Sequence, residues 1–365
     1  MPYEERLGLY KQIQEIRKRP LLVYVTSSRN QASGSMATDV VPPFLDQMEE
    51  ISQNGDKSID FLIASFGGDP TVAWRLMSLL RERFENVTAL IPQAAFSAAT
   101  LLALGANEIL MHPNGNLGPV DPQISKPASP SGNGVKFGHE DFMSFLKIAE
   151  EAGLSSDEAK IQLFMEFCRE TGPLAVGVSA RSSKLSLSMS QQMLMMHMDG
   201  EEDKAKTIAE KLTKNYFHHG YPVSRSEAIE IGLNVAERTE NVEKLIWDVW
   251  IDIESEFRMR TPFDPLQEYL RAEPNSEVLT PIQQVNFPQG LPVGAYPQIV
   301  QAILSSNPTT ISGLPPVDFD LELALVESEK FASRHRATGK ILATRDQNVK
   351  INVNTIVMEN SWRRL

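Results

Sequence analysis

Two strand-to-helix junctions of this sequence carry residue types that are suited to acyl transfer. Gly67 and Gly68 follow one apolar, β-rich run, and about 30 residues later Ser97 follows another, at the start of a helical run. A hydroxyl at a helix N-terminus lies beside unbonded N–H groups and the positive end of the helix dipole. Glycines let a bare peptide N–H turn toward a substrate carbonyl. We therefore expect Ser97 as a nucleophile, with an oxyanion hole made by Ala98 and by Gly67 or Gly68.

Each junction also has a purely structural interpretation. A Gly-Gly pair after a strand is often only a turn, and serine is a favoured N-cap residue. Thr100 lies one turn into the helical run and is expected to be a packing residue. The occurrence of both motifs in neighbouring strand–helix units is what favours the catalytic interpretation.

Composition narrows the possible functions. The chain has 365 residues, 42% of them apolar and 22% charged, which is typical of a globular protein. Its formal net charge of −12 argues against a nucleic-acid partner. The single cysteine, Cys168, excludes disulfide scaffolds and cysteine-based zinc sites. It is expected on the core-facing side of an amphipathic helix rather than as a nucleophile. The sequence contains no P-loop, HExxH or GxSxG motif, so we expect no cofactor and no metal.

The residues at the beginning of the sequence favour a cytoplasmic protein. Residues 1–20 are highly charged and predict an amphipathic helix rather than a signal peptide. No apolar run reaches the ~18 residues of a membrane span.

Strand and helix signals alternate in the first third of the chain, which indicates an α/β fold with a parallel sheet. Active sites of such folds lie beyond the carboxyl ends of the strands, where Gly67 and Ser97 are placed. We expect strands at 21–26, 59–65, 87–91 and 108–111, and helices at 40–52 and 71–84 and after Ser97.

The rest of the chain is predicted in less detail. Residues 125–136 indicate a loop, and 140–215 a helical subregion that includes a methionine cluster expected in the core. Prolines become frequent after 261, which suggests a boundary near 260. We thus expect an N-terminal helix over 1–20, a main domain over 21–260 and a C-terminal extension of unknown fold over 261–365. Further helices are expected at 224–231, 241–258 and 322–334, and strands at 340–344 and 349–357.

Several short stretches together resemble one family. They are SFGGD (65–69), AFSAAT (95–100), GANEILM (105–111), LGPVDPQ (117–123) and HHGYPVSRSEAIEIGL (218–233). This combination resembles the serine dehydrogenase proteinase family, which is grouped with the Clp protease proteolytic subunit and signal peptide peptidase A in the crotonase-like superfamily. The likeness covers about residues 20–250.

The resemblance implies a ClpP/crotonase-like spiral of ββα units and a serine endopeptidase that forms an acyl-enzyme on Ser97. It implies Gly68 and Ala98 as oxyanion donors. Ala99 stands where many relatives have glycine, and Phe66 where proline is common; neither change removes a reacting group.

Two types of residue are candidates for the general base, a histidine and a lysine. One hypothesis is His219, oriented by Asp121, because imidazole has an unperturbed pKa of about 6.5; His218 is its neighbouring rival. The other is a Ser–Lys dyad with Lys136, which would have to be desolvated to act as a base.

Partners and alternative functions follow from the same resemblance. We expect a peptide or protein substrate, a homo-oligomer, and an unidentified regulatory partner bound through the C-terminal extension. The alternatives are a catalytically inactive crotonase-like scaffold or binding subunit and, less favoured, an acyl-CoA enzyme.

Overall fold

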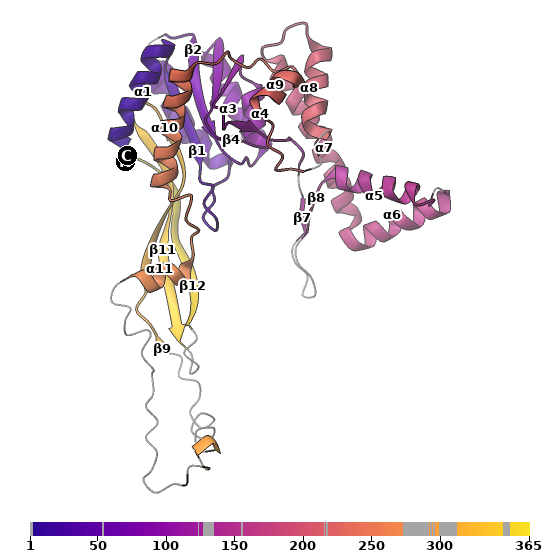
Figure 1. Ribbon diagram of the computed structural model, residues 1–365, viewed down its shortest axis with the longest axis vertical. Coiled ribbons are helices and arrows are strands. Elements are labelled where there is room, and N and C mark those ends of the chain that lie inside the picture. Colours follow the sequence, from indigo (N-terminus) through magenta and orange to yellow (C-terminus); the bar gives the residue numbers. More distant parts are fainter. Residues whose placement is uncertain are drawn as a thin grey trace.

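A computed structural model describes residues 3–365 except 53–54, 123, 127–134, 155, 215, 217, 273–291, 293, 295, 299–311 and 346–350. Its centre is an eight-stranded sheet in the order β12-β11-β10-β1-β2-β3-β5, with β9 paired to β11 (Figure 1). The parallel part consists of β1 (Leu21–Thr26), β2 (Ser58–Ala64), β3 (Asn86–Ile91) and β5 (Glu108–Met111). These are the four strands that the sequence predicts, to within one residue at each end.

Helices cover both faces of the sheet. Successive side chains of a strand point to opposite faces, so the fully apolar run of β1 places apolar groups on both. In β1, Leu22 and Tyr24 face one core cluster, whereas Val23 and Val25 face another. The first cluster packs against α2 (Val41–Ile51), α3 (Pro70–Arg83), α4 (Ala98–Leu104), α7 (Pro173–Met195), α8 (Glu202–Lys214) and α9 (Arg225–Ile231). The second packs against α1 (Tyr3–Arg17) and α10 (Glu240–Glu256). The predicted methionines Met189 and Met193 lie in the first cluster.

Short parallel pairings form a second layer at the carboxyl ends of the main strands. β4 (Ala94–Ala95) pairs with β6 (Asn116–Leu117), and single bridges join Met36 to Gly68 and Ser65 to Ala95. A main strand, a short pairing segment and a helix therefore recur along the chain. This repetition is the spiral of ββα units that the sequence resemblance implies.

The C-terminal segment continues the same sheet. β10 (Val317–Glu327) runs antiparallel to β1, followed by β11 (Ala332–Arg345) and β12 (Ile351–Arg364), which extend downward in Figure 1. The short β9 (Ser312–Gly313) and α11 (Pro265–Arg271) lie beside these strands. Ala324 and Val326 of β10 belong to the main core, so the C-terminal strands form an extra region that is joined to the parallel sheet along β1.

The helix predicted over Glu322–Arg334 is wrong, since these residues lie in β10, a turn and β11. Leucine, glutamate and alanine favour a helix in isolation. However, apolar and polar residues alternate from Asp318 to Leu323, and pairing with β1 stabilises the extended form.

A buried cluster of charges fastens this segment to α1. Arg6 and Glu327 are each 0% exposed, and two guanidinium nitrogens of Arg6 lie 3.1 and 2.9 Å from the Glu327 carboxylate oxygens. Arg334 also binds Glu327, at 2.6 Å, and Arg6 reaches Asp252 and Glu256 on α10. Removing one partner from such a cluster leaves a buried charge uncompensated, so α1, α10 and β10 are held as one unit.

A helical hairpin projects from the opposite side of the body (Figure 1). It contains α5 (His139–Glu151) and α6 (Asp157–Thr171), and it follows two short strands, β7 (Ile124–Lys126) and β8 (Val135–Phe137). Cys168, expected in a core, is only partly buried, because α6 has no buried residue. Of the helices described, none is both long and apolar enough to cross a membrane.

Candidate active site

Ser97 occupies a strained turn between β4 and α4. Its φ of 55° and ψ of −119° lie outside the regions that a non-glycine residue favours. Such a conformation costs about 1–3 kcal/mol and persists only when the surrounding structure enforces it. The side chain is half-buried and does not cap the helix, so the hydroxyl is not used as an N-cap.

The diglycine bend after β2 lies directly against this serine. Gly67 and Gly68 have φ values of 98° and 152°, in the region that favours glycine. A Cβ on Gly67 would lie 2.8 Å from the Ser97 Cβ and 3.0 Å from the Ala98 nitrogen. A Cβ on Gly68 would collide with the Met36 backbone. Gly67 is therefore required for the two junctions to approach each other, and Gly68 for the segment at Met36 to pack against the bend.

Ser65 determines which of the two glycine N–H groups is available. The Gly67 N–H donates to the Ser65 Oγ at 3.1 Å, and that oxygen also accepts from the Thr26 hydroxyl at 2.8 Å. Within the described residues, the N–H groups of Gly68 and Ala98 have no hydrogen-bond acceptor. Of the two glycines considered from the sequence, Gly68 is thus the better candidate for an oxyanion donor.

His219 and Asp121 form a hydrogen-bonded pair at the same site. The His219 Nδ1 lies 2.8 Å from Asp121 Oδ1, and their side chains are 38% and 16% exposed. Asp121 follows β6, and His219 lies in the turn after α8. A carboxylate on Nδ1 favours the tautomer in which Nε2 is unprotonated and can accept a proton.

Ser97 and His219 line one cavity of about 350 Å³, here called the nucleophile cavity. Its walls consist of Phe66, Gly68, Pro70, Ser97, Ala98, Leu101, Val120, Pro122, Ser182, Leu185, Ser186 and His219. Among the described residues the Ser97 hydroxyl makes no hydrogen bond, including none to His219. Catalytic hydrogen bonds are often long without substrate and shorten when it binds.

The two alternative bases are placed differently. His218 is exposed, its Nδ1 accepts the Gly220 N–H at 3.0 Å, and it does not line the nucleophile cavity. Lys136 lies in β8, paired with Ser125, rather than in the loop expected from its composition. The side chain of Lys136 lies outside the described part of the structure, so its distance from Ser97 stays open.

Thr100 is a structural residue, as the sequence predicts. Its buried hydroxyl lies 2.6 Å from the Ala95 carbonyl oxygen and 2.9 Å from that of Gly118, and it accepts the Gly118 N–H at 3.1 Å. It thereby joins α4 to the segments that flank Ser97 and Asp121.

Sequence reasoning missed the wall that α7 contributes. Ser182, Leu185 and Ser186 lie some 85 residues after Ser97, yet they line the nucleophile cavity. Their spacing of three and four residues is typical of one helix face, but nothing in the sequence says what that face covers. Within the described residues no cluster of side chains could hold a metal ion.

Two uncharacterized proteins of Methanocaldococcus jannaschii are similar to the chain. MJ0137 is 31% identical over 183 residues, which is 49% of this chain and 54% of that protein. MJ1495 is 30% identical over 196 residues, or 53% and 56%. The chain thus spans about half the length of the curated relatives that it matches.

Solved structures give more distant likenesses. The 1510-N membrane-bound stomatin-specific protease, as a point mutant, is 15% identical, covers 61% of this chain and 82% of its own, and gives a TM-score of 0.38. ClpP1 from Listeria monocytogenes is 12% identical, covers 64% and 99%, and gives a TM-score of 0.32.

A family match covers part of the candidate site. Residues 49–139 carry the diglycine bend, the nucleophile candidate and Asp121. Over this segment the sequence resemblance is confirmed, because these residues match the family of ClpP-like SDH-type serine proteinases.

Proposed function

We propose that this chain is a serine peptidase that forms an acyl-enzyme on Ser97. The observation that carries the proposal is the shared nucleophile cavity, in which Ser97 faces the same space as His219 while Asp121 holds the Nδ1 of that histidine. The match of residues 49–139 to a serine proteinase family supports the same reaction class.

In the proposed mechanism, His219 acts as general base and then as general acid. Its Nε2 takes the Ser97 proton as Oγ attacks the scissile carbonyl carbon, and the carbonyl π electrons move to the oxygen. When the tetrahedral intermediate collapses, the C–N bond breaks and the imidazolium gives its proton to the leaving amine. Water, deprotonated by the same imidazole, then attacks the ester carbon. The C–O bond to Ser97 breaks, Oγ takes the proton back from the imidazolium, and the acid is released. Asp121 orients the ring and stabilises its charged form.

Backbone N–H groups would stabilise the oxyanion. The proposed donors are Gly68 and Ala98, the first from the diglycine bend and the second from the N-terminus of α4. Loss of one such donor typically costs about 3–4 kcal/mol of transition-state stabilisation. Thr26 and Ser65 act as positioning residues, because they hold the Gly67 N–H away from the cavity.

The expected substrate is a peptide or protein, as the sequence resemblance implies. Leu101, Val120 and Leu185 give the nucleophile cavity apolar walls that suit an apolar side chain beside the scissile bond. The cytoplasmic location and a regulatory partner for the C-terminal segment stay predictions.

Exposed apolar side chains on the α5–α6 hairpin support the expected homo-oligomer. Ile148, Ile161 and Met165 are 64%, 59% and 59% exposed. Large apolar side chains exposed on two neighbouring helices favour a protein contact. A second copy is the proposed occupant, because the resemblance implies a homo-oligomer.

Ser97 is predicted to react covalently with a fluorophosphonate probe. Wild type should be labelled at one site, Ser97→Ala should not be labelled, and Ser182→Ala should behave as wild type, since Ser182 lines the same cavity without the helix N-terminus. In-gel fluorescence and peptide mass mapping make the measurement. Absence of labelling in wild type would favour the inactive scaffold.

His219→Ala should lower the labelling rate of Ser97 by about 10²- to 10⁴-fold, because the hydroxyl loses its proton acceptor. Lys136→Ala and the neighbouring His218→Ala should leave the rate within about twofold. Labelling reactions quenched at a series of times give these rates. A large loss in Lys136→Ala with little change in His219→Ala would replace the histidine with a Ser–Lys dyad.

Ser65→Ala should lower kcat for a small ester substrate by about 10- to 100-fold at nearly constant KM. The Gly67 N–H loses its acceptor, so the Gly68 donor is held less accurately. Ser78→Ala, in α3, is the matched control. Equal kcat values for Ser65→Ala and wild type, at an unchanged melting temperature, would contradict the positioning role.

The combined variant Ile148→Glu, Ile161→Glu should dissociate the oligomer, because charge replaces the apolar contact. Gln162→Glu adds a charge on the same helix without removing an apolar group, and it should keep the wild-type mass. Light scattering after size-exclusion chromatography makes the comparison. A wild-type mass equal to the 40.7 kDa of one chain would exclude this interface.

A further inference from the structure

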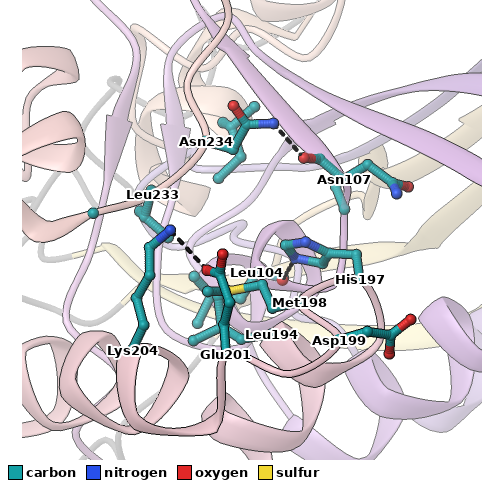
Figure 2. Close-up of a pocket in the computed structure, with 13 residues that line it drawn as sticks. Leu104, Asn107, Leu194, His197, Met198, Asp199, Glu201, Lys204, Leu233 and Asn234 are labelled. Carbon is teal, nitrogen blue, oxygen red and sulfur yellow. Dashed lines mark hydrogen bonds and ion pairs between the residues drawn. The ribbon is translucent and has the colours of Figure 1, made fainter.

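A second cavity, of about 400 Å³, lies at the other end of α4 from Ser97 (Figure 2). Its walls come from the end of α4, the turn after α7, the first turn of α8 and the segment after α9. None of these wall residues also lines the nucleophile cavity. The proposed peptidase mechanism does not use it.

The floor of the second cavity is apolar. Its side chains are all less than a tenth exposed: Leu104, Ala106, Ile109, Leu194 and Leu233. Two amides also stand on its wall: the Asn234 Nδ2 donates to the Asn107 carbonyl oxygen at 2.7 Å, and the Asn107 Oδ1 accepts from Arg81 and from the Val87 N–H. A bound molecule would therefore place an apolar body on this floor.

His197 offers an acceptor to such a molecule. Its Nε2 lies 3.0 Å from the Leu104 carbonyl oxygen, which can only accept, so the proton lies on Nε2. Burial lowers the pKa of this imidazole, which keeps the ring neutral and the Nδ1 lone pair free at neutral pH. Figure 2 shows the ring extending toward the middle of the cavity.

The rim carries more negative than positive groups. Glu201 and Lys204 form an ion pair at 2.8 Å, each about half exposed, and Asp199 adds a second carboxylate. The C-terminal ends of α4, α7 and α9 meet here and favour cations, whereas the N-terminus of α8, beside Glu201, favours anions. Arg81 is a further cation close to this wall, and it is bound to the Gly105 carbonyl oxygen and to Asn107.

We infer that the second cavity binds a primary ammonium group attached to a short apolar body. The apolar part lies on the Leu104 and Leu194 floor, and the ammonium donates to the His197 Nδ1 and to the Glu201 carboxylate. Lys204 competes with the ligand for Glu201. This inference does not rest on the peptidase reaction, and its test measures binding alone.

Four probes with the same branched alkyl body test the charge that the cavity selects. They are isoamylamine, leucinamide, leucine and 4-methylpentanoate, measured with the full chain by saturation-transfer NMR and calorimetry. We expect both amines without a carboxylate to bind with millimolar dissociation constants, and 4-methylpentanoate to bind at least tenfold more weakly. Equal or tighter binding of 4-methylpentanoate overturns the inference. Leucinamide tighter than isoamylamine would identify an amino acid or peptide amine as the source, and the reverse a simple amine; both support the site.

Substitutions of three exposed residues test whether the probe binds at Glu201. Glu201→Gln should weaken isoamylamine binding at least fivefold, and Lys204→Gln should strengthen it two- to fivefold, because the competing charge is removed. Glu202→Gln, next along the chain but not on the cavity wall, is the matched control and should change nothing. Binding that is unaffected by Glu201→Gln, or weakened by Lys204→Gln, overturns the inference.

Discussion

The backbone of Ser97 is the constraint on which the candidate site depends. A serine at φ 55° and ψ −119° relaxes unless its neighbours prevent it. On one side the Thr100 hydroxyl ties α4 to the Ala95 and Gly118 carbonyls. On the other side Gly67 lies so close that any side chain there would meet Ser97. The strain keeps the hydroxyl away from the capping position that an ordinary helix start would give it.

The remaining parts of the site come from elements that are far apart in the sequence, and this division separates their tasks. β2 and β4 place the diglycine bend and Ser97, whose relative position depends on backbone hydrogen bonds. The turn after α8 brings His219, and its only fixed partner in the described structure is Asp121. The proposed nucleophile and the proposed N–H donors are therefore held rigidly, whereas the imidazole is 38% exposed and less constrained. Substrate that fills the cavity would be expected to order the histidine.

Local sequence patterns predicted the elements that depend on hydrophobic periodicity and on turn residues within a short stretch of chain. The strands at 21–26 and 108–111 are apolar runs bounded by polar residues, and Ser97 follows from strand–helix alternation. The failures have physical causes as well. Glu322–Arg334 favours a helix by composition, but its first part pairs with β1 and its last part with β10. The wall contributed by Leu185 depends on how α7 packs. The choice of Gly68 over Gly67 depends on one hydrogen bond to Ser65, which spacing cannot reveal.

The position of β1 in the sheet has a consequence for biosynthesis. Val23 pairs with Leu62 on one side and with Glu327 on the other. The partner of one edge of β1 is therefore synthesised about 300 residues after β1 itself. At ribosomal speeds of 5–20 residues per second, that wait lasts roughly 15–60 s. During this interval the unpaired N–H and C=O groups on that edge of β1 are open to wrong pairing. Correct folding therefore depends on keeping this edge unpaired until β10 is made.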